Sequence, residues 1–174
     1  EIAAGSFSLT AFYRRRIVRL LPALGVMMAV VLLVGGFVLF PTSLRDLGQS
    51  AAATVAFGSN IYFYATSDYF AQSSDLKPLV HTWSLAVEEQ FYLGYPLLLL
   101  AMRQLSQHAK IVVLTVLGAA SFAVGAWLAV TDLTAGFYLL PARIWELVIG
   151  GLIALGAFPK ITNARLREAI CWLA

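Results

Sequence analysis

The chain has 174 residues, of which 60% are hydrophobic and only 12% are charged, with a formal net charge of +3. A soluble domain carries about 25% charged residues, so half that share among long apolar runs indicates an integral membrane protein. The single cysteine, Cys171, excludes a disulfide within the chain, and neither metal-ligand spacing nor a glycine-rich phosphate loop is present. We therefore expect no metal and no nucleic-acid partner.

Four apolar segments each approach the ~20 residues that a helix needs to cross ~30 Å of hydrocarbon. They cover about 18–40, 83–102, 111–130 and 138–158, and a fifth begins near Ala164 and is truncated. The expected fold is all-α, a polytopic transmembrane helix bundle. Residues 1–174 are expected to be an internal piece of a longer protein.

The stretch Leu47–Ala65 is ambiguous, because it is helical in composition but small and polar for a segment that faces lipid. It could span within the bundle, re-enter the membrane, or lie at the interface. Ala52, Ala56 and Asn60 recur at helical spacing, which favours close packing on a neighbouring helix.

The placement of Lys and Arg helps to choose among these alternatives. Basic clusters stand at 14–19, 103–110 and 160–167. If all three are cytoplasmic, residues 41–82 must begin and end on the outer side. We therefore expect Leu47–Ala65 to be interfacial or re-entrant, and the Arg14–Arg19 side to be cytoplasmic; a full crossing would move one basic cluster outside.

The first candidate site lies at the start of the second apolar segment, in the run from Lys77 to Tyr92. Ionisable groups near the centre of a membrane helix cost roughly 2.5–3.5 kcal/mol each, which makes a functional site the default hypothesis. His81, Ser84 and Glu88 share a helical face, and Glu89 lies on an adjacent one. We predict His81, Glu88 and Glu89 as catalytic candidates for general acid–base work; the alternative is a polar network that ties this helix to its neighbours.

The second candidate site is the arginine cluster before the first apolar segment. Arg16 and Arg19 are three positions apart and lie on one side of a helix. The guanidinium fork suits phosphate oxygens, so both are candidates for binding a phosphorylated donor such as a nucleotide or coenzyme A. The alternative is that they only set the orientation of the chain.

Two further groups complete the candidates. Arg143 and Glu146, also three residues apart, could form a structural ion pair or a substrate clamp. Asn60, Asp68 and Asp75 lie in the expected outer segment, where they could hydrogen-bond a sugar or belong to a solvated loop.

These clusters, in this order, resemble acyltransferase family three, the integral membrane O-acyltransferases of bacterial surface glycans. The match at 79–93 is nearly the family signature, and the other matches are short. The matching segments are Phe12–Ala23 with Arg16 and Arg19, Ser59–Phe63 followed by Asp68-Tyr-Phe70, Leu79–Leu93, and Tyr138–Leu147 with its Pro-Ala-Arg-Ile-Trp-Glu run.

The resemblance implies transfer of an acyl group, often acetyl, from cytoplasmic acyl-CoA to a hydroxyl of a glycan or lipid-linked sugar. It implies that Arg16 and Arg19 contact the donor and that the catalytic candidates lie near the outer face. We predict Asn60, Trp83, Arg143 and Glu146 as substrate-binding candidates.

The family domain is about twice this length, and its first helix carries a histidine proposed for catalysis. That histidine has no counterpart in this sequence, and His81 does not replace it. The resemblance implies that residues 1–174 are a partial multi-pass acyltransferase domain of the bacterial inner membrane, with its first and last helices missing. The implied partners are lipid, the acceptor and the rest of its own chain. A proton-coupled transporter or flippase of a glycan or lipid is the alternative, because buried carboxylates and a histidine also suit proton coupling.

Overall fold

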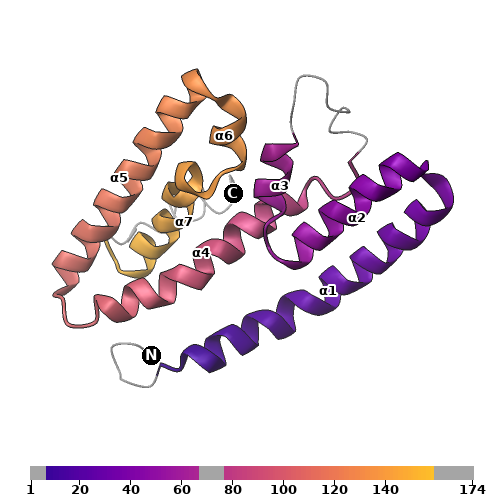
Figure 1. Ribbon diagram of the computed structural model, residues 1–174. Coiled ribbons are helices and arrows are strands. Elements are labelled where there is room, and N and C mark those ends of the chain that lie inside the picture. The colour runs from indigo at the N-terminus through magenta and orange to yellow at the C-terminus, as the bar shows by residue number, and fades with distance from the viewer. Residues whose placement is uncertain (1–6, 67–76, 159–174) are drawn as a thin grey trace, which may run out of the picture.

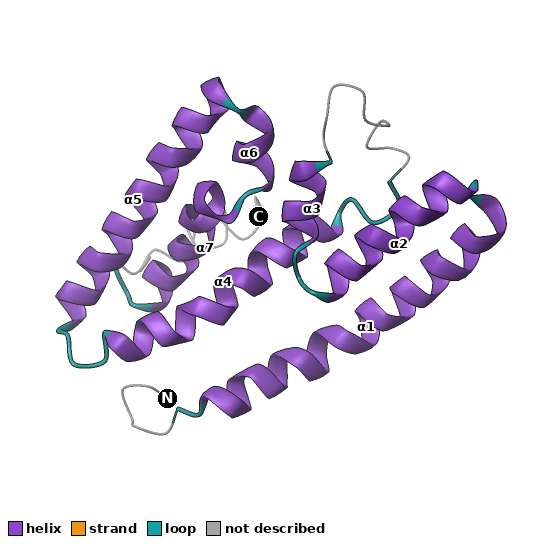
Figure 2. Ribbon diagram, in the orientation of Figure 1, coloured by secondary structure: helices purple, strands orange, loops and turns teal. Residues whose placement is uncertain are grey.

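The computed structural model describes residues 7–66 and 77–158, and these ranges contain helices and connecting turns without a strand (Figure 2). The expected all-α membrane bundle is confirmed. The expectations for Asp68, Asp75 and the segment from Ala164 onward fall outside the described residues. The helices are α1 (Leu9–Val38), α2 (Pro41–Val55), α3 (Ser59–Ala65), α4 (Thr82–Ala101), α5 (Gln107–Thr131), α6 (Leu133–Tyr138) and α7 (Leu140–Ala154).

Three stretches of the described residues are long and apolar enough to cross a membrane: α1, α5, and α6 with α7 as Leu133–Ala154. The helix α4 corresponds to the second expected span, 83–102. Its 20 residues have the required length, but the polar run Glu88-Glu89-Gln90 makes it less apolar than the other three. The chain is therefore a multi-pass membrane protein in which α4 is the polar member.

Helix α1 begins earlier than the apolar run alone suggests. Ser8 caps it by accepting a hydrogen bond from the Ala11 N–H at 3.3 Å. The Arg14–Arg19 cluster consequently lies within the first turns of α1 and not ahead of it. Pro41 occupies the start of α2, where its missing N–H has no consequence, and α2 returns alongside α1 (Figure 1).

The ambiguous stretch Leu47–Ala65 is not one helix, because the chain turns sharply between α2 and α3. Phe57 has a φ of 51°, and the Gly58 N–H donates to the Ala53 carbonyl at 2.8 Å, which closes the end of α2. The expected packing of Ala52 and Ala56 is wrong: both are exposed, since the turn ends the helical period before Asn60. With 15 and 7 residues, neither helix is long enough to cross alone.

The core has two parts, and α4 lies between them (Figure 1). One part joins α1, α2, α3 and the first turns of α4 around Leu47, Phe63 and Leu79. The other joins α4, α5 and α7 around Leu114 and Val148. The backbones of α1 and α4 do not pack closely, so only long side chains bridge the space between them.

Candidate functional site

An ion pair between Arg16 of α1 and Glu89 of α4 bridges this space. The Arg16 Nε donates to both Glu89 carboxylate oxygens, at 3.2 and 3.3 Å, and a terminal guanidinium nitrogen also donates to Oε1. The Arg16 guanidinium carbon lies 3.6 Å from the centre of the Tyr92 ring. Glu89 and Tyr92 meet the same arginine because residues three apart share a helical face.

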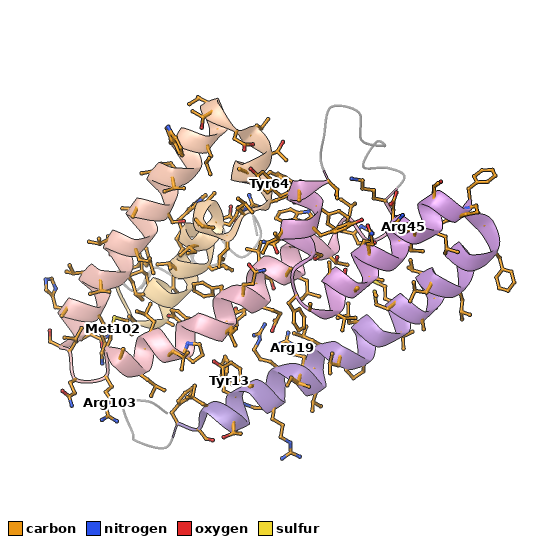
Figure 3. All side chains as sticks on the ribbon, in the orientation of Figure 1. Tyr13, Arg19, Arg45, Tyr64, Met102 and Arg103 are labelled. Atoms are coloured by element: carbon orange, nitrogen blue, oxygen red, sulfur yellow. The ribbon has the colours of Figure 1, made fainter. Side chains whose placement is uncertain are left out.

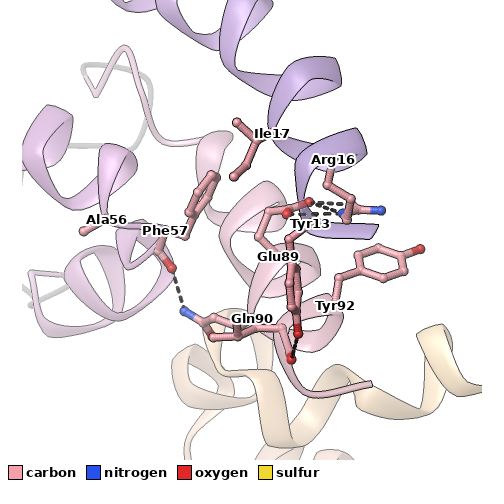
Figure 4. A pocket seen from close by; sticks show the side chains of 9 residues that line it. Tyr13, Arg16, Ile17, Ala56, Phe57, Glu89, Gln90 and Tyr92 are labelled. Carbon is pink, nitrogen blue, oxygen red and sulfur yellow. Dashed lines mark hydrogen bonds and ion pairs between the residues drawn. The ribbon is translucent and has the colours of Figure 1, made fainter. Parts of the chain in front are cut away.

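A pocket of about 330 Å³ opens beside this ion pair (Figure 4). It has a polar side formed around Arg16 and Glu89, and an apolar side formed by residues of α1, the α2–α3 turn and α4. The Tyr13 hydroxyl closes one edge by donating to the Leu93 carbonyl at 2.7 Å. The lining residues are Tyr13, Arg16, Ile17, Ala56, Phe57, Glu89, Gln90, Tyr92 and Leu93.

Gln90 connects the pocket to the α2–α3 turn. Its amide nitrogen donates to the Phe57 carbonyl at 2.8 Å and to the Asn60 Oδ1 at 2.8 Å. The Asn60 nitrogen donates in turn to the Tyr138 carbonyl at 3.2 Å. Asn60 is only 1% exposed, so its amide serves interactions within the protein at the position where a sugar contact was expected.

A second polar network fastens the start of α4. The Thr54 and Thr82 hydroxyls lie 2.9 Å apart, and the Ser59 hydroxyl donates to the Thr82 carbonyl at 2.9 Å. All three side chains are buried. The polar network that the sequence left open as an alternative therefore exists, but it uses Thr82 and Gln90, whereas Glu89 faces the pocket.

The remaining catalytic candidates lie away from the pocket. His81 and Glu88 are exposed on one side of α4, together with Ser84. Glu88 is not among the residues that line the pocket, whereas its neighbours Glu89 and Gln90 are. Arg19 is likewise exposed and is not among the pocket residues. Figure 3 shows it on α1, farther along the helix than Tyr13.

The expected pair of Arg143 and Glu146 is confirmed, with an N–O distance of 3.1 Å. The Arg143 guanidinium carbon lies 5.1 Å from the Trp83 ring and 5.8 Å from the Phe137 ring. Three of the expected substrate-binding residues, Trp83, Arg143 and Glu146, thus form one cluster, separate from the pocket.

Tyr64 and Asp132 join α3 to the start of α6. The Tyr64 hydroxyl donates to Asp132 Oδ2 at 3.0 Å, while Asp132 Oδ1 accepts from the Ala135 N–H at 2.9 Å. The hydrogen bond and the charge of Asp132 raise the pKa of Tyr64 above its ordinary value.

Sequence reasoning did not select Tyr13 and Phe57 as site residues, and it noted Tyr92 only for its place on α4. Gly58 signals a break in helical structure, which could have drawn attention to Phe57. Nothing in the spacing around Tyr13 indicates a partner 80 residues away.

The family model described as acyltransferase domain, of acyltransferase family three, matches residues 4–174. No solved structure gives a significant match. An uncharacterized protein of Haemophilus influenzae is 34% identical over 162 residues, which are 89% of this chain and 66% of that protein.

Two O-acetyltransferases are also similar. The peptidoglycan O-acetyltransferase OatA of Listeria monocytogenes is 32% identical over 86% of this chain and 25% of its own length. The O-acetyltransferase OatA of Staphylococcus aureus is 38% identical over 52% of this chain and 15% of its own length. The chain thus spans from 15% to 66% of the lengths of these relatives. Since the family model extends over nearly the whole sequence, the chain belongs to acyltransferase family three.

Proposed function

We propose that the protein is an O-acyltransferase that moves an acyl group, with acetyl expected, from acyl-CoA to a hydroxyl of a cell-surface glycan or lipid-linked sugar. Membership of the family supports acyl transfer, and two similar proteins are O-acetyltransferases by name. The structural observation that carries the proposal is the pocket between α1 and α4, with Arg16 in its wall.

Arg16 is the proposed contact for the anionic part of the donor. Its side chain is 22% exposed and is oriented on both sides, by the Glu89 carboxylate and by the Tyr92 ring. A guanidinium held in this way binds phosphate oxygens with little further loss of side-chain freedom. Arg19, exposed one turn away, adds a second positive charge for a donor that carries several phosphates.

The reaction requires a base as well as a donor site. The acceptor oxygen bonds to the acyl carbon, the carbon–sulfur bond breaks, and the hydroxyl proton is transferred through the base to the departing thiolate. We propose Glu89 for the base, because it is the catalytic candidate that lines the pocket. His81 and Glu88 remain catalytic candidates, which would meet the acceptor on the exposed side of α4.

The positive-inside rule supports the orientation of the bundle in a bacterial inner membrane. The Arg14–Arg19 turns begin α1, and Arg103 follows the end of α4. These two helix ends lie toward the same side of the bundle (Figure 1). We propose that this side is cytoplasmic, which gives Arg16 and Arg19 access to cytoplasmic acyl-CoA.

The test uses the complete protein in membranes and measures the acylated glycan. Arg16→Ala combined with Arg19→Ala is expected to abolish transfer without affecting membrane insertion. Normal acylation by this double variant would contradict the donor site. Membranes that translocate the glycan without acylating it would support the transporter alternative.

A matched pair of substitutions tests the base. Glu89→Gln removes the carboxylate that lines the pocket, and Glu88→Gln makes the same chemical change at the exposed neighbour. We expect the Glu89 variant to lose about 10²–10⁴-fold in transfer rate and the Glu88 variant to lose much less. Equal losses would contradict the assignment of the base to Glu89.

A further inference from the structure

Phe57 adopts a backbone conformation that its side chain disfavours. With a φ of 51°, it is the non-glycine residue with positive φ among the described residues. Glycine usually occupies this position at the end of a helix, because it has no Cβ to clash. The sequence has a glycine one residue later, at Gly58, whose φ of −117° does not need one. A phenylalanine in this strained conformation points to a role for its side chain.

The surrounding hydrogen bonds hold Phe57 in this conformation. The Phe57 N–H donates to the Thr54 carbonyl at 3.0 Å, and the Phe57 carbonyl accepts from Gln90 at 2.8 Å. The second of these bonds comes from α4, next to Glu89. The position of the ring is therefore coupled to the helix that carries the other side of the pocket.

The ring of Phe57 lies on the apolar side of the pocket, near Ile17 (Figure 4). Arg16 and Glu89 form the opposite, charged side. An acyl-CoA donor has a matching asymmetry, with anionic phosphates at one end and an uncharged acyl group at the other. If the pocket takes this donor, the acyl group points toward Phe57 and the thioester lies beside Glu89, while the phosphates extend past Arg16.

We propose that Phe57 is a specificity-determining residue whose ring closes the acyl end of the pocket and restricts the donor to short acyl groups. This inference rests on the proposed function, since it assumes that the pocket takes the acyl donor. The ring also packs against the core around Leu47 and Phe63, so the test must separate acyl selection from packing.

Phe57→Ala and Phe57→Gly distinguish the side chain from the backbone. Both remove the ring, but only glycine relieves the left-handed backbone, so the glycine variant should melt at the higher temperature. Val55→Ala is the control, because Val55 is 66% exposed and lies outside the pocket lining. The assay compares transfer from acetyl-, butyryl- and hexanoyl-CoA by the complete protein in membranes.

Both ring-removing variants are expected to raise the hexanoyl-to-acetyl ratio of transfer about tenfold or more, the size of effect that a methylene makes in an apolar pocket. Val55→Ala should leave the ratio unchanged. Phe57→Leu, which keeps apolar packing, should fold as the parent does and give a smaller shift in the same direction.

Two outcomes would overturn the role of Phe57 while leaving the proposed function intact. The first is an unchanged acyl ratio in the leucine, alanine and glycine variants. The second is a shift in the glycine variant alone, which would trace the effect to relief of the backbone strain. If the parent protein transfers no acyl group from any of the three donors, the proposed function fails and this inference fails with it.

Discussion

The ion pair between Arg16 and Glu89 offers a quantitative test of how α1 is held against α4. Its side chains are 22% and 12% exposed, so the pair is neither fully buried nor fully exposed to solvent. Breaking a fully buried pair costs about 3–5 kcal/mol, whereas an exposed pair contributes about 0.2–1 kcal/mol. After discounting for solvent screening, we expect a coupling free energy of about 2 kcal/mol between the two side chains.

The individual substitutions should differ in a defined order. Arg16→Ala removes the ion pair and also the contact with the Tyr92 ring, which contributes about another 1 kcal/mol. Glu89→Ala removes the ion pair and leaves the arginine over the ring. The arginine variant should therefore be the less stable of the two.

A double-mutant cycle of Arg16→Ala and Glu89→Ala isolates the coupling free energy. The free energy of unfolding can be measured by titrating the protein with SDS in mixed detergent micelles, provided that unfolding is two-state. Arg19→Ala is the matched control, since Arg19 is exposed on the same helix, and its effect should stay within about 0.5 kcal/mol. A coupling near zero, or an equal effect of Arg19→Ala, would refute the view that this pair holds α1 to α4.

Two further predictions concern packing and buried polar groups. A Cβ at Gly151 would collide with the Tyr95 hydroxyl, whereas one at Gly150 would meet nothing within 4 Å. Gly151→Ala should therefore destabilise the protein by about 1–3 kcal/mol in thermal unfolding, whereas Gly150→Ala should not. Adding Tyr95→Phe to Gly151→Ala should restore most of the lost stability. Asn60→Leu should cost about 1–3 kcal/mol, because the half-buried amide of Gln90 loses one of its two acceptors. Gln90→Leu combined with it should cost less than the sum of the single changes, and additive losses would contradict the amide pair.

Much of the fold could be predicted from local sequence. The apolar runs that became α1 and α5 are long enough that only a membrane helix suits them, and the spacing of Arg143 and Glu146 predicted their ion pair. The same reasoning failed between Ala52 and Asn60, because helical periodicity assumes an unbroken helix. The turn at Phe57 depends on bonds from Gln90, 33 residues away.

The candidate site, like the fold, could be predicted from the sequence only in part. The family signature around Glu88 and Glu89, and the arginines of α1, are properties of short segments and were evident from their order along the chain. Which carboxylate faces the pocket depends on how α4 is rotated against α1, and that rotation is set by contacts such as Thr54 with Thr82 that join distant segments.

The sequence by itself determined that this is a helical membrane protein with polar residues concentrated on one span, because hydrophobicity and helical spacing act over a few turns. Only the tertiary structure decided that Arg16 meets Glu89 across 73 positions and that Phe57 lines the same pocket. Both contacts depend on packing between segments that lie far apart in the chain. The free energy of that packing cannot be read from a local sequence pattern.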